Sequence, residues 1–232
     1  LTEFDATEED FAKVAVKNHQ NGLLNPKAHL QKNITIDDVM NSAVVASPLK
    51  LYDCCPFSDG ASSVVLCSEK FAKAHGGDYV EVIGSGRGGS PAALQGREHM
   101  TTIPSTKIAA KAAYDMAGIT AKDVDFAEVH DCFTIAEVVD TEDLGFFGKG
   151  QGIQAIREDR TKLNSDISIN PSGGLKSKGH PIGATGVGQV AEVFDQLTGK
   201  AGARTVKDAK IGLTHNFGAT GASCAVHVFQ SV

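Results

Sequence analysis

The residues with the clearest chemical potential lie in a five-residue segment, VHDCF, at positions 129–133. Residues 125–129 have the apolar pattern of a strand and residues 133–144 that of a helix, so the segment joins a strand end to a helix start. A thiol in the first helical turn lies at the positive end of the helix dipole, and this dipole and the nearby His130 both favour a thiolate. We therefore predict that Cys132 is the reactive cysteine of the chain. A small buried thiol beside a core histidine is the alternative that such a pair leaves open.

A second candidate segment, SGGLKSKGHPIGATG, occupies residues 172–186 and contains five glycines. Glycines let the backbone approach a ligand closely, and a helix expected over residues 185–197 offers free N–H groups to an anion or a developing oxyanion. His180 lies between these two parts and is held by Pro181. A flexible surface loop is the alternative, but a titratable residue inside such a backbone is a costly way to build a plain connection.

A third segment, HNFG, spans residues 215–218 at the end of an expected strand. Asn216 could donate a hydrogen bond to a carbonyl, and Gly218 could present its backbone N–H. Taken alone, a hairpin turn that uses Asn and Gly is the simpler interpretation. All three segments follow strands, which is where open α/β sheets place their ligands.

Several formal motif matches carry little weight. Residues 84–89 (GSGRGG) fit GxGxxG after a strand, but no acidic residue closes a second strand at the expected spacing, which disfavours a dinucleotide site. Residues 174–179 have the length of a P-loop, yet His180 stands where its lysine should be. Cys54 and Cys55 are interpreted as packing residues in a loop. No cluster of His, Cys or carboxylate residues has metal-ligand spacing, so no metal site is predicted.

The elements that position these segments alternate between strands and helices, which predicts an α/β layered domain. Thr7 and Asp10 form a helix-start pattern, and Gly118 ends a later helix that Ser105 is expected to cap. Residues 22–51 are irregular and are expected to form a long loop. The expected helices are 7–19, 69–75, 105–117, 133–144 and 185–197, and the expected strands are 61–67, 79–84, 125–129, 210–216 and 222–229, the last two forming a hairpin.

Composition narrows the class of protein further. The chain has 232 residues, enough for a proper buried core, and its 22 basic and 28 acidic side chains give a net charge of −6, which argues against a nucleic-acid partner. No apolar run reaches the length of a membrane span, and the first residues do not resemble a signal peptide, so no membrane partner is expected. Five cysteines without CxxC spacing suit a reducing compartment. We expect a soluble, cytoplasmic protein.

Taken together, the segments resemble the thiolase family. Residues 179–186 (GHPIGATG) look like its GHPxGAxG block, residues 170–174 (NPSGG) like the N-x-x-G-G before it, and residues 58–61 (SDGA) like its DGA strand start. Residues 130–133 (HDCF) and 216–218 (NFG) are similar to the branch related to sterol carrier protein x and archaeal acetoacetyl-CoA thiolases. In that branch the acid/base thiol is thought to come from the HDCF cysteine.

The resemblance implies a thiolase-like layered α/β fold, with a five-stranded mixed sheet that has helices on both faces and is preceded by part of a loop domain. Residues 1–57 would be the end of the loop domain that covers coenzyme A, and residues 58–232 the C-terminal catalytic domain. The resemblance extends over the whole chain but over only about half of a thiolase, because the half with the nucleophilic cysteine has no counterpart here. The first residue, Leu1, fits the same expectation of a processed chain, a fragment or one half of a longer protein.

The implied activity is acyl transfer of thiolase type: Claisen condensation of acyl-CoA or thiolytic cleavage of 3-ketoacyl-CoA. By resemblance, His180 would activate the nucleophile, Cys132 would move the α-proton, and His130 would donate to the enolate oxygen. Asn216 stands where commoner thiolases have their late cysteine, and the Gly218 N–H would contribute to the second oxyanion site. This chain alone is expected to be inactive.

No separate cofactor is expected, since the coenzyme A thioester is the substrate. The residues expected to line its path are Cys55, Phe57, Ser58 and Gly179. The expected partners are the missing N-terminal half, in cis or in trans, and further copies in a homodimer or homotetramer. The alternative function is a non-catalytic acyl-CoA-binding or scaffold subunit, and a nucleotide-dependent oxidoreductase built on residues 84–89 is a remote third option.

Overall fold

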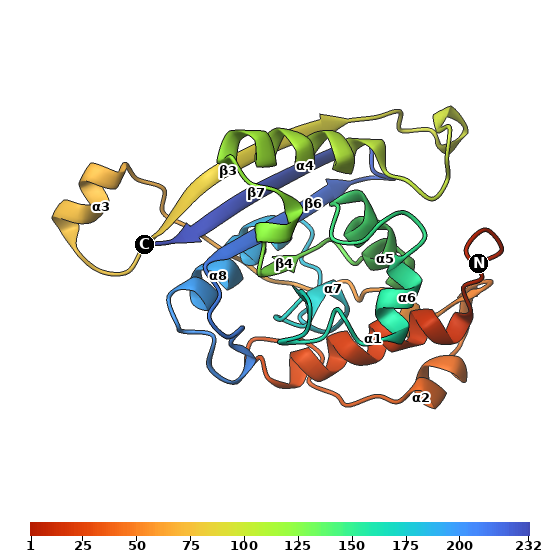
Figure 1. The fold of residues 1–232 in the computed structure, drawn as a ribbon. Helices are drawn as coiled ribbons and strands as arrows, with labels where there is room; N and C mark the ends of the chain where they lie inside the picture. Colours follow the sequence, from red (N-terminus) through yellow and green to blue (C-terminus); the bar gives the residue numbers. More distant parts are fainter.

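Five strands form one mixed sheet in the computed structural model, which describes all residues 1–232 (Figure 1). The strands follow the order β3-β7-β6-β4-β5. The three long ones, β3, β7 and β6, are antiparallel neighbours, whereas β4 runs parallel to both β6 and β5. Their bounds are Val80–Gly89 for β3, Phe126–Glu128 for β4, Ser168–Ile169 for β5, Ile211–Gly218 for β6 and Ser223–Ser231 for β7. The predicted mixed sheet is confirmed.

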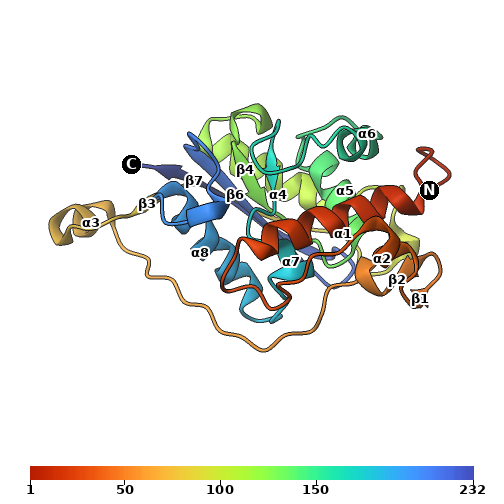
Figure 2. The same ribbon diagram turned by 90° about the horizontal axis from the view of Figure 1, so that it is seen from below.

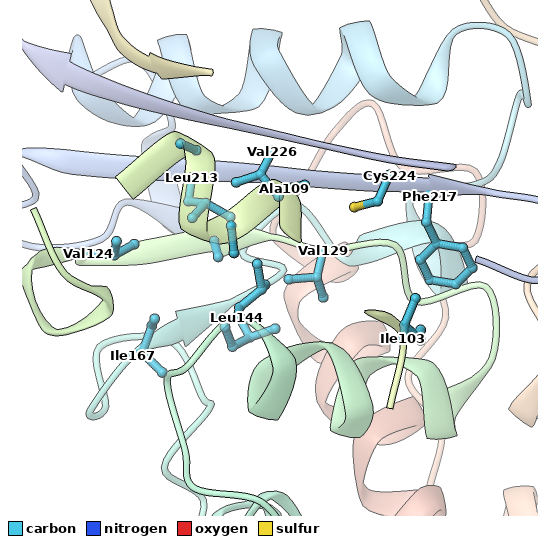
Figure 3. Close-up of a cluster of buried hydrophobic side chains, with 14 of the residues drawn as sticks. Ile103, Ala109, Val124, Val129, Leu144, Ile167, Leu213, Phe217, Cys224 and Val226 are labelled. Carbon is cyan, nitrogen blue, oxygen red and sulfur yellow. The ribbon is translucent and has the colours of Figure 1, made fainter. Parts of the chain in front are cut away.

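Helices cover both faces of this sheet, as predicted. On one face, α4 (Pro104–Ala117) and α5 (Thr134–Asp143) enclose the largest apolar cluster, and on the other α8 (Thr185–Leu197) packs Val193 against Phe126 and Phe229. The larger cluster joins side chains from the sheet and from α4 and α5, and it includes Val129, Leu213 and Val226 (Figure 3). Burial of these side chains supplies most of the driving force that holds the sheet and helices together.

The remaining elements lie around this unit. A long helix, α1, crosses beneath the sheet and α5, and Figure 2 shows it from the side on which it lies next to α7. The helices are α1 (Glu8–Leu23), α2 (Ile36–Met40), α3 (Glu69–His75), α6 (Gly152–Arg157) and α7 (Gly174–Ser177), and a small ribbon joins β1 (Val44–Ala46) to β2 (Leu49–Lys50). The segment 22–51, expected to be a loop, therefore contains one short helix and this ribbon.

Helix starts follow the expected chemistry in one case and not in another. Thr7 caps α1 with a capping box: its hydroxyl accepts from the Asp10 N–H at 3.3 Å, and the Asp10 carboxylate accepts from the Thr7 N–H at 2.8 Å. Ser105 does not cap α4, because the helix already begins at Pro104 with Ile103 at the N-cap. The Ser105 hydroxyl instead donates to the Gly221 carbonyl at 2.6 Å, which fixes α4 to the turn after β6.

The glycine-rich motif at residues 84–89 is part of a strand. β3 continues through this motif to Gly89, five residues beyond the expected end at Gly84. Helix α4 packs directly against every second glycine of the motif. A Cβ at Gly86 would lie 1.9 Å from the Ala109 carbonyl oxygen, and one at Gly88 equally close to the Ser105 carbonyl oxygen. These glycines therefore allow close helix–strand packing and do not form a phosphate-binding loop.

This contact predicts a large stability effect at one glycine and a small one at a neighbour. Gly86→Ala should lower the free energy of unfolding by about 3 kcal/mol, because a backbone carbonyl cannot yield space. Gly89→Ala is the matched control: its Cβ would meet only the Ala222 carbonyl oxygen, at 3.9 Å, so a change of about 0.5 kcal/mol or less is expected. Urea unfolding followed by circular dichroism measures both, and equal losses would contradict this packing argument.

Residues 61–67 were expected to form a strand but belong to no sheet. The segment is extended and exposed, and Figure 2 shows it as part of a long loop that leads away from the body to α3. Val65 is 91% exposed and Leu66 79% exposed. The apolar pattern is that of a strand, but a strand requires a neighbour, and the described chain places none beside it.

Candidate active site

Two histidines from different segments meet at the end of the central strands. His130 lies in the turn after β4, and His180 lies in the loop between α7 and α8. Their rings are 5.1 Å apart and perpendicular, and the His130 ring also lies 4.6 Å from the ring of Phe217 on β6. Both histidines are buried. The structure thus brings together the VHDCF and glycine-rich segments.

The hydrogen bonds of His180 fix which of its nitrogens carries the proton. The Thr185 hydroxyl has one hydrogen, which it donates to the Pro181 carbonyl at 3.1 Å. The same oxygen lies 2.7 Å from Nδ1 of His180, so Nδ1–H is the donor there and Nε2 is left as an acceptor. Burial, followed by the positive charge of Lys178, lowers the pKa of His180. A neutral imidazole with a free Nε2 is the form that a general base requires.

His130 is held neutral and has an unused ring nitrogen. Burial, followed by the nearby His180, lowers the pKa of His130 to about 3. Its Nδ1 is buried without a hydrogen-bond partner, while its backbone N–H donates to Nδ1 of His215 at 3.4 Å. A neutral imidazole still carries one ring N–H, so His130 can donate to an oxygen that enters the site.

A buried histidine, His215, supports the backbone of His130 and was not singled out as a site residue from the sequence. His215 is completely buried on β6, with Nε2 2.9 Å from the Thr106 hydroxyl and Nδ1 3.6 Å from Oδ2 of Asp140. Burial, followed by His130, lowers the pKa of His215 to about 3, and burial raises that of Asp140 well above its ordinary value. Only the alternation of side chains along β6 could have indicated that His215 faces the opposite side from Asn216.

The expectation that Cys132 is a thiolate is wrong. Cys132 precedes the N-cap Phe133, so it lies outside the first turn of α5, and it is half-buried. Burial raises the pKa of the Cys132 thiol to about 12, and the negative charges of Asp140, Cys55 and Asp131 add to this effect. The desolvation of the thiolate outweighs the helix dipole, and the resting group is therefore a thiol.

The segment with two adjacent cysteines lies alongside Cys132. Cys54 pairs with Phe133 in an antiparallel bridge, and the Cys55 N–H donates to the Cys132 carbonyl at 3.0 Å. In this register Cys55 is directly opposite Cys132. The interpretation of Cys54 and Cys55 as mere packing residues is therefore incomplete, because their segment forms one wall beside the candidate acid/base thiol.

The residues that follow Cys55 lie beside His180. Phe57 forms a parallel bridge with His180, and the Ser58 hydroxyl accepts from the His180 N–H at 3.1 Å. Gly179 has φ +108°, and a Cβ there would lie 2.6 Å from Oγ of Ser58. Only glycine fits this position, so the glycine before His180 is explained by a close approach of two segments.

Asn216 and Gly218 lie on β6, farther from the histidine pair. Asn216 is half-buried and its amide donates to Oε1 of Gln189 on α8 at 3.3 Å. A Cβ on Gly186 would lie 3.8 Å from the Asn216 side chain, which places Asn216 beside the first turn of α8. Gly218 ends β6, is exposed, and would place a Cβ in open space.

A cleft of about 750 Å³ opens next to His180. Three of the four residues expected to bind coenzyme A line it, and Cys55 does not, since Cys55 lies beside Cys132. Basic and acidic side chains are both present at its rim. The residues that line the cleft include Phe57, Ser58, Gly179, Lys27, His29 and Lys178.

Buried hydrogen bonds hold the HDCF turn in place. The Asp131 carboxylate accepts from the Leu175 N–H at 2.7 Å and from the Asn18 amide at 2.8 Å. The same Asn18 amide nitrogen lies 2.8 Å from the Glu137 carboxylate, which pairs with Lys17 at 2.6 Å. Because α1, α5 and α7 each contribute, a helix from the first 57 residues forms part of the support of the site.

No group of three or more His, Cys, Asp or Glu side chains is arranged to hold a metal ion. None of the helices is both long enough and apolar enough to cross a membrane.

The mixed sheet with helices on both faces is that of a thiolase-like domain, and comparison with known families agrees. The family model described as "Thiolase C-terminal domain-like" matches residues 86–231, and the chain therefore belongs to the thiolase family. The acetyl-CoA acetyltransferase of Methanothermobacter thermautotrophicus is 47% identical over 230 residues, which are 99% of this chain and 60% of that protein. Human sterol carrier protein 2 is 39% identical over 231 residues, covering 92% of this chain and 40% of that protein.

Solved structures show the same fold. The Ltp2-ChsH2(DUF35) aldolase superposes with a TM-score of 0.89 at 24% identity, over 99% of this chain and 60% of that chain. A monomeric SCP2-thiolase-like protein type 1 from Mycobacterium smegmatis gives a TM-score of 0.75 at 15% identity, over 100% of this chain and 48% of that chain. The present chain thus spans about 60% or less of the proteins it matches.

Proposed function

We propose that this chain is the C-terminal half of a thiolase-type acyltransferase that condenses acyl-CoA molecules or cleaves 3-ketoacyl-CoA. The observation that carries the proposal is the meeting of His130 and His180, 5.1 Å apart, beside the turn that holds Cys132. Both imidazoles are neutral, and Nε2 of His180 is free to accept a proton. Membership of the thiolase family supports this assignment.

The proposed reaction has two proton-coupled steps. First, a cysteine of the missing half attacks an acyl-CoA carbonyl carbon, His180 accepts the thiol proton, and the coenzyme A thiol leaves with a proton. Second, Cys132 as a thiolate removes an α-proton from another acyl-CoA, and the carbanion attacks the enzyme thioester so that the nucleophilic thiolate leaves. In cleavage the same thiol of Cys132 donates the proton. A positioned acid or base contributes about 10²–10⁴-fold to such a step.

His130 and the end of β6 have the supporting role of binding oxygen. The ring N–H of His130 would donate to the enolate oxygen, and the Gly218 N–H and the Asn216 amide would serve the second oxygen. One such donor contributes about 3 kcal/mol to stabilisation of the transition state. The cleft next to Ser58 and Gly179 is the proposed path for the pantetheine chain.

Exposed apolar residues support a covering N-terminal half, in cis or in trans. The unpaired segment 61–67 exposes Val65 and Leu66, and the adjoining helix and strand expose Phe71 (54%) and Val82 (49%). A contiguous apolar surface of this kind is typical of an interface. The relatives are longer than this chain, which leaves room for such a half. We also propose assembly into a homodimer or homotetramer.

A chimera tests the proposed activity. This chain is fused, at the equivalent position, to the part of the Methanothermobacter relative that it does not match, and acetoacetyl-CoA thiolysis is followed by loss of the 3-ketoacyl absorbance. Turnover is expected for the chimera and none for this chain alone. Turnover by this chain alone would contradict the need for a second half.

The same chimera also tests the alternative function, a non-catalytic acyl-CoA-binding subunit. A folded chimera that binds acetyl-CoA by calorimetry, yet neither exchanges nor cleaves acyl groups, would replace the enzyme proposal with a non-catalytic binding subunit. A matched Cys→Ala variant at the nucleophile of the added half verifies that any turnover comes from the assembled site.

The proposed covering surface makes a separate prediction. With the two halves expressed as separate chains, Val65→Glu with Leu66→Glu should weaken their association at least about 100-fold, because two charges would have to be buried without partners. Met116→Glu is the matched control, since Met116 on α4 is 65% exposed and lies outside this surface. Affinity is measured by calorimetry or co-purification. Equal affinities for the two variants would show that residues 61–67 do not contact the other half.

A further inference from the structure

Asp140 is a completely buried carboxyl group that receives no hydrogen bond. It lies on α5, and both of its carboxyl oxygens are enclosed without a donor. Asp143, nearly one turn further along the same helix, differs: its carboxylate accepts from the Ile103 N–H at 2.6 Å and lies 3.4 Å from Nζ of Lys149. Because a buried carboxylate without donors or a cation is very costly, Asp140 must be accommodated in another way.

A ring nitrogen of His215 faces the Asp140 carboxyl group. Nδ1 of His215 lies 3.6 Å from Oδ2 of Asp140, a separation that is too long for a hydrogen bond. The same Nδ1 lies 3.4 Å from the backbone nitrogen of His130, whose N–H donates to it. Nδ1 therefore presents its lone pair and carries no proton.

The other ring nitrogen of His215 carries the proton. Nε2 lies 2.9 Å from the Thr106 hydroxyl oxygen, and that hydroxyl directs its own hydrogen to Sγ of Cys224 at 3.7 Å. The Thr106 oxygen is thus free to accept from Nε2–H. One proton on Nε2 and a lone pair on Nδ1 make His215 a neutral imidazole. Burial, followed by His130, lowers the pKa of His215 to about 3, which agrees with this arrangement.

No free cation is among the charged and titratable groups that face Asp140. Glu137 and Asp143 lie on its own helix, and the two nearby lysines, Lys17 and Lys149, are already paired with them. The other groups that face Asp140 are Asp131 and Cys132 from the HDCF turn, His215 from β6 and Cys224 from β7. Burial, followed by the charges of Asp143, Asp131 and Glu137, raises the pKa of Asp140 well above its ordinary value.

We propose that Asp140 is an uncharged carboxylic acid, and that it and His215 form a neutral buried pair that positions the backbone of His130. An uncharged Asp140 does not require a proton on Nδ1 of His215, so Nδ1 stays free to accept from the His130 N–H. An ionised Asp140 would draw a proton onto Nδ1, and the His130 N–H would then face a second N–H without an acceptor. The protonation of Asp140 therefore decides whether the backbone of His130 is held.

The role of this pair in the reaction rests on the proposed function. Asp140 and His215 are both completely buried, so they act through His130, which is proposed to donate to the enolate oxygen. Both are therefore positioning residues. The neutral pair itself is a property of this chain and does not depend on that function, so the pair and its role are tested separately.

The first experiment compares Asp140→Asn with the wild-type chain in urea unfolding between pH 5 and pH 7. An acid that is protonated in the folded chain and ionised in the unfolded chain loses its proton on unfolding, so the folded chain becomes less stable as the pH rises. Asparagine has nearly the same shape and no proton to lose. The unfolding equilibrium constant of the wild type, relative to that of Asp140→Asn, should therefore increase by up to about tenfold per pH unit.

Asp10→Asn is the matched control, because the Asp10 carboxylate is held by an ion pair with Arg157, with hydrogen bonds of 2.9 Å and 2.8 Å. This ion pair keeps Asp10 ionised in the folded chain, so Asp10→Asn should be less stable than the wild type by about the same factor at pH 5 and pH 7. A ratio for Asp140→Asn that does not change with pH, or that changes in the opposite direction, would overturn the neutral pair.

A second measurement does not depend on the folding of Asp140→Asn. In wild-type protein labelled with nitrogen-15 in the histidine rings, with the His215 signals assigned by comparison with His215→Gln, the spectrum at pH 7 should show a protonated Nε2 and an unprotonated Nδ1. An imidazolium, or a proton on Nδ1, would overturn the neutral pair, because either would leave the His130 N–H without its acceptor.

The positioning role is measured in the chimera described above, by cleavage of acetoacetyl-CoA. His215→Leu removes the acceptor of the His130 N–H and should lower kcat about tenfold, with KM within about threefold, because the cleft proposed to bind coenzyme A is left intact. His215→Gln offers a side-chain oxygen instead and should recover most of this loss. His227→Leu is the control, since His227 is a half-buried histidine on the neighbouring strand β7.

The outcomes separate this inference from the proposed function. A wild-type chimera without turnover contradicts the proposed function, whereas a folded His215→Leu chimera with the wild-type kcat contradicts the positioning role. A loss in His215→Leu that His215→Gln does not recover also contradicts it, because lost packing would then be the cause.

Discussion

Replacing Cys132 by alanine in the assembled enzyme should lower the rate of α-proton exchange by about 10²–10⁴-fold and leave acylation of the nucleophile measurable. The reason is that the two half-reactions use different groups: acylation requires His180 and the nucleophilic cysteine, whereas α-proton removal requires a base at Cys132. Exchange is measured as loss of the acetyl-CoA methyl proton signal in D₂O. Acylation is measured as the mass of the acetylated nucleophile after rapid quenching.

The pH dependence gives this prediction a sign. Burial and neighbouring carboxylates raise the pKa of Cys132 to about 12, so below that pH the thiolate is the minor form. Its fraction increases about tenfold with each pH unit, so exchange in the wild type should rise steadily between pH 7 and pH 10. Cys132→Ala should lose this rise.

The control for this prediction is the neighbouring thiol. Cys54→Ala removes a half-buried cysteine whose backbone pairs with Phe133, so it perturbs the same turn without removing the proposed base. Exchange by Cys54→Ala should remain within about threefold of the wild-type rate, since the variant loses only the packing of this side chain and its weak hydrogen bond to the Lys50 carbonyl. If Cys132→Ala exchanged α-protons as fast as Cys54→Ala does, Cys132 would not be the base.

The parts of the fold that depend on local pattern were predictable. The α8 boundaries, the capping box at Thr7, the hairpin of β6 and β7, and the left-handed Gly118 at the end of α4 follow from periodicity and capping chemistry. Each depends on residues within a few positions of one another. The strand-like segment 61–67 shows where this reasoning ends: its pattern is local, but a strand also requires a neighbour, and the fold places none beside it.

The candidate site was predictable as a set of residues but not as an electrostatic environment. Motifs indicated His130, Cys132 and His180, and the structure places them within one turn and loop region. The charge state of Cys132 was not predictable, because it depends on Asp140 and Cys55, which approach it only in the folded chain. Proximity in sequence suggested activation by the helix dipole, whereas burial has the larger effect.

The support behind the site was equally hidden from the sequence. Asn18, more than one hundred residues before the HDCF turn, donates to both Asp131 and Glu137. Lys17 and Asn18 lie on the helix that looks merely amphipathic in the sequence. Both side chains are buried against α5 and α7 and hold these elements through hydrogen bonds. The sequence does not distinguish such buried polar residues from polar residues on a solvent-exposed helix face.

The second prediction of large effect concerns His180. His180→Asn should lower the rate of acylation of the nucleophile by about 10²–10⁴-fold, because it removes the imidazole that is proposed to accept the thiol proton. Thr185→Val should have a smaller effect, about tenfold, since it removes the hydrogen bond that fixes the proton on Nδ1 and leaves the imidazole itself in place. His227→Asn is the control, because His227 is a half-buried histidine on β7 outside the site.

The acid limb of the pH profile tests the same assignment. Burial and the charge of Lys178 lower the pKa of His180, so the imidazole is mainly neutral at neutral pH and acquires its proton at a lower pH than an exposed histidine does. Acylation by the assembled enzyme should therefore be constant between pH 7 and pH 8 as far as His180 is concerned, and should fall at acidic pH. Lys178→Met removes a positive charge that disfavours protonation, which raises the pKa of His180 and should move the acid limb to higher pH. An acid limb that stays at the same pH in Lys178→Met and in Thr185→Val would show that a group other than His180 accepts the proton.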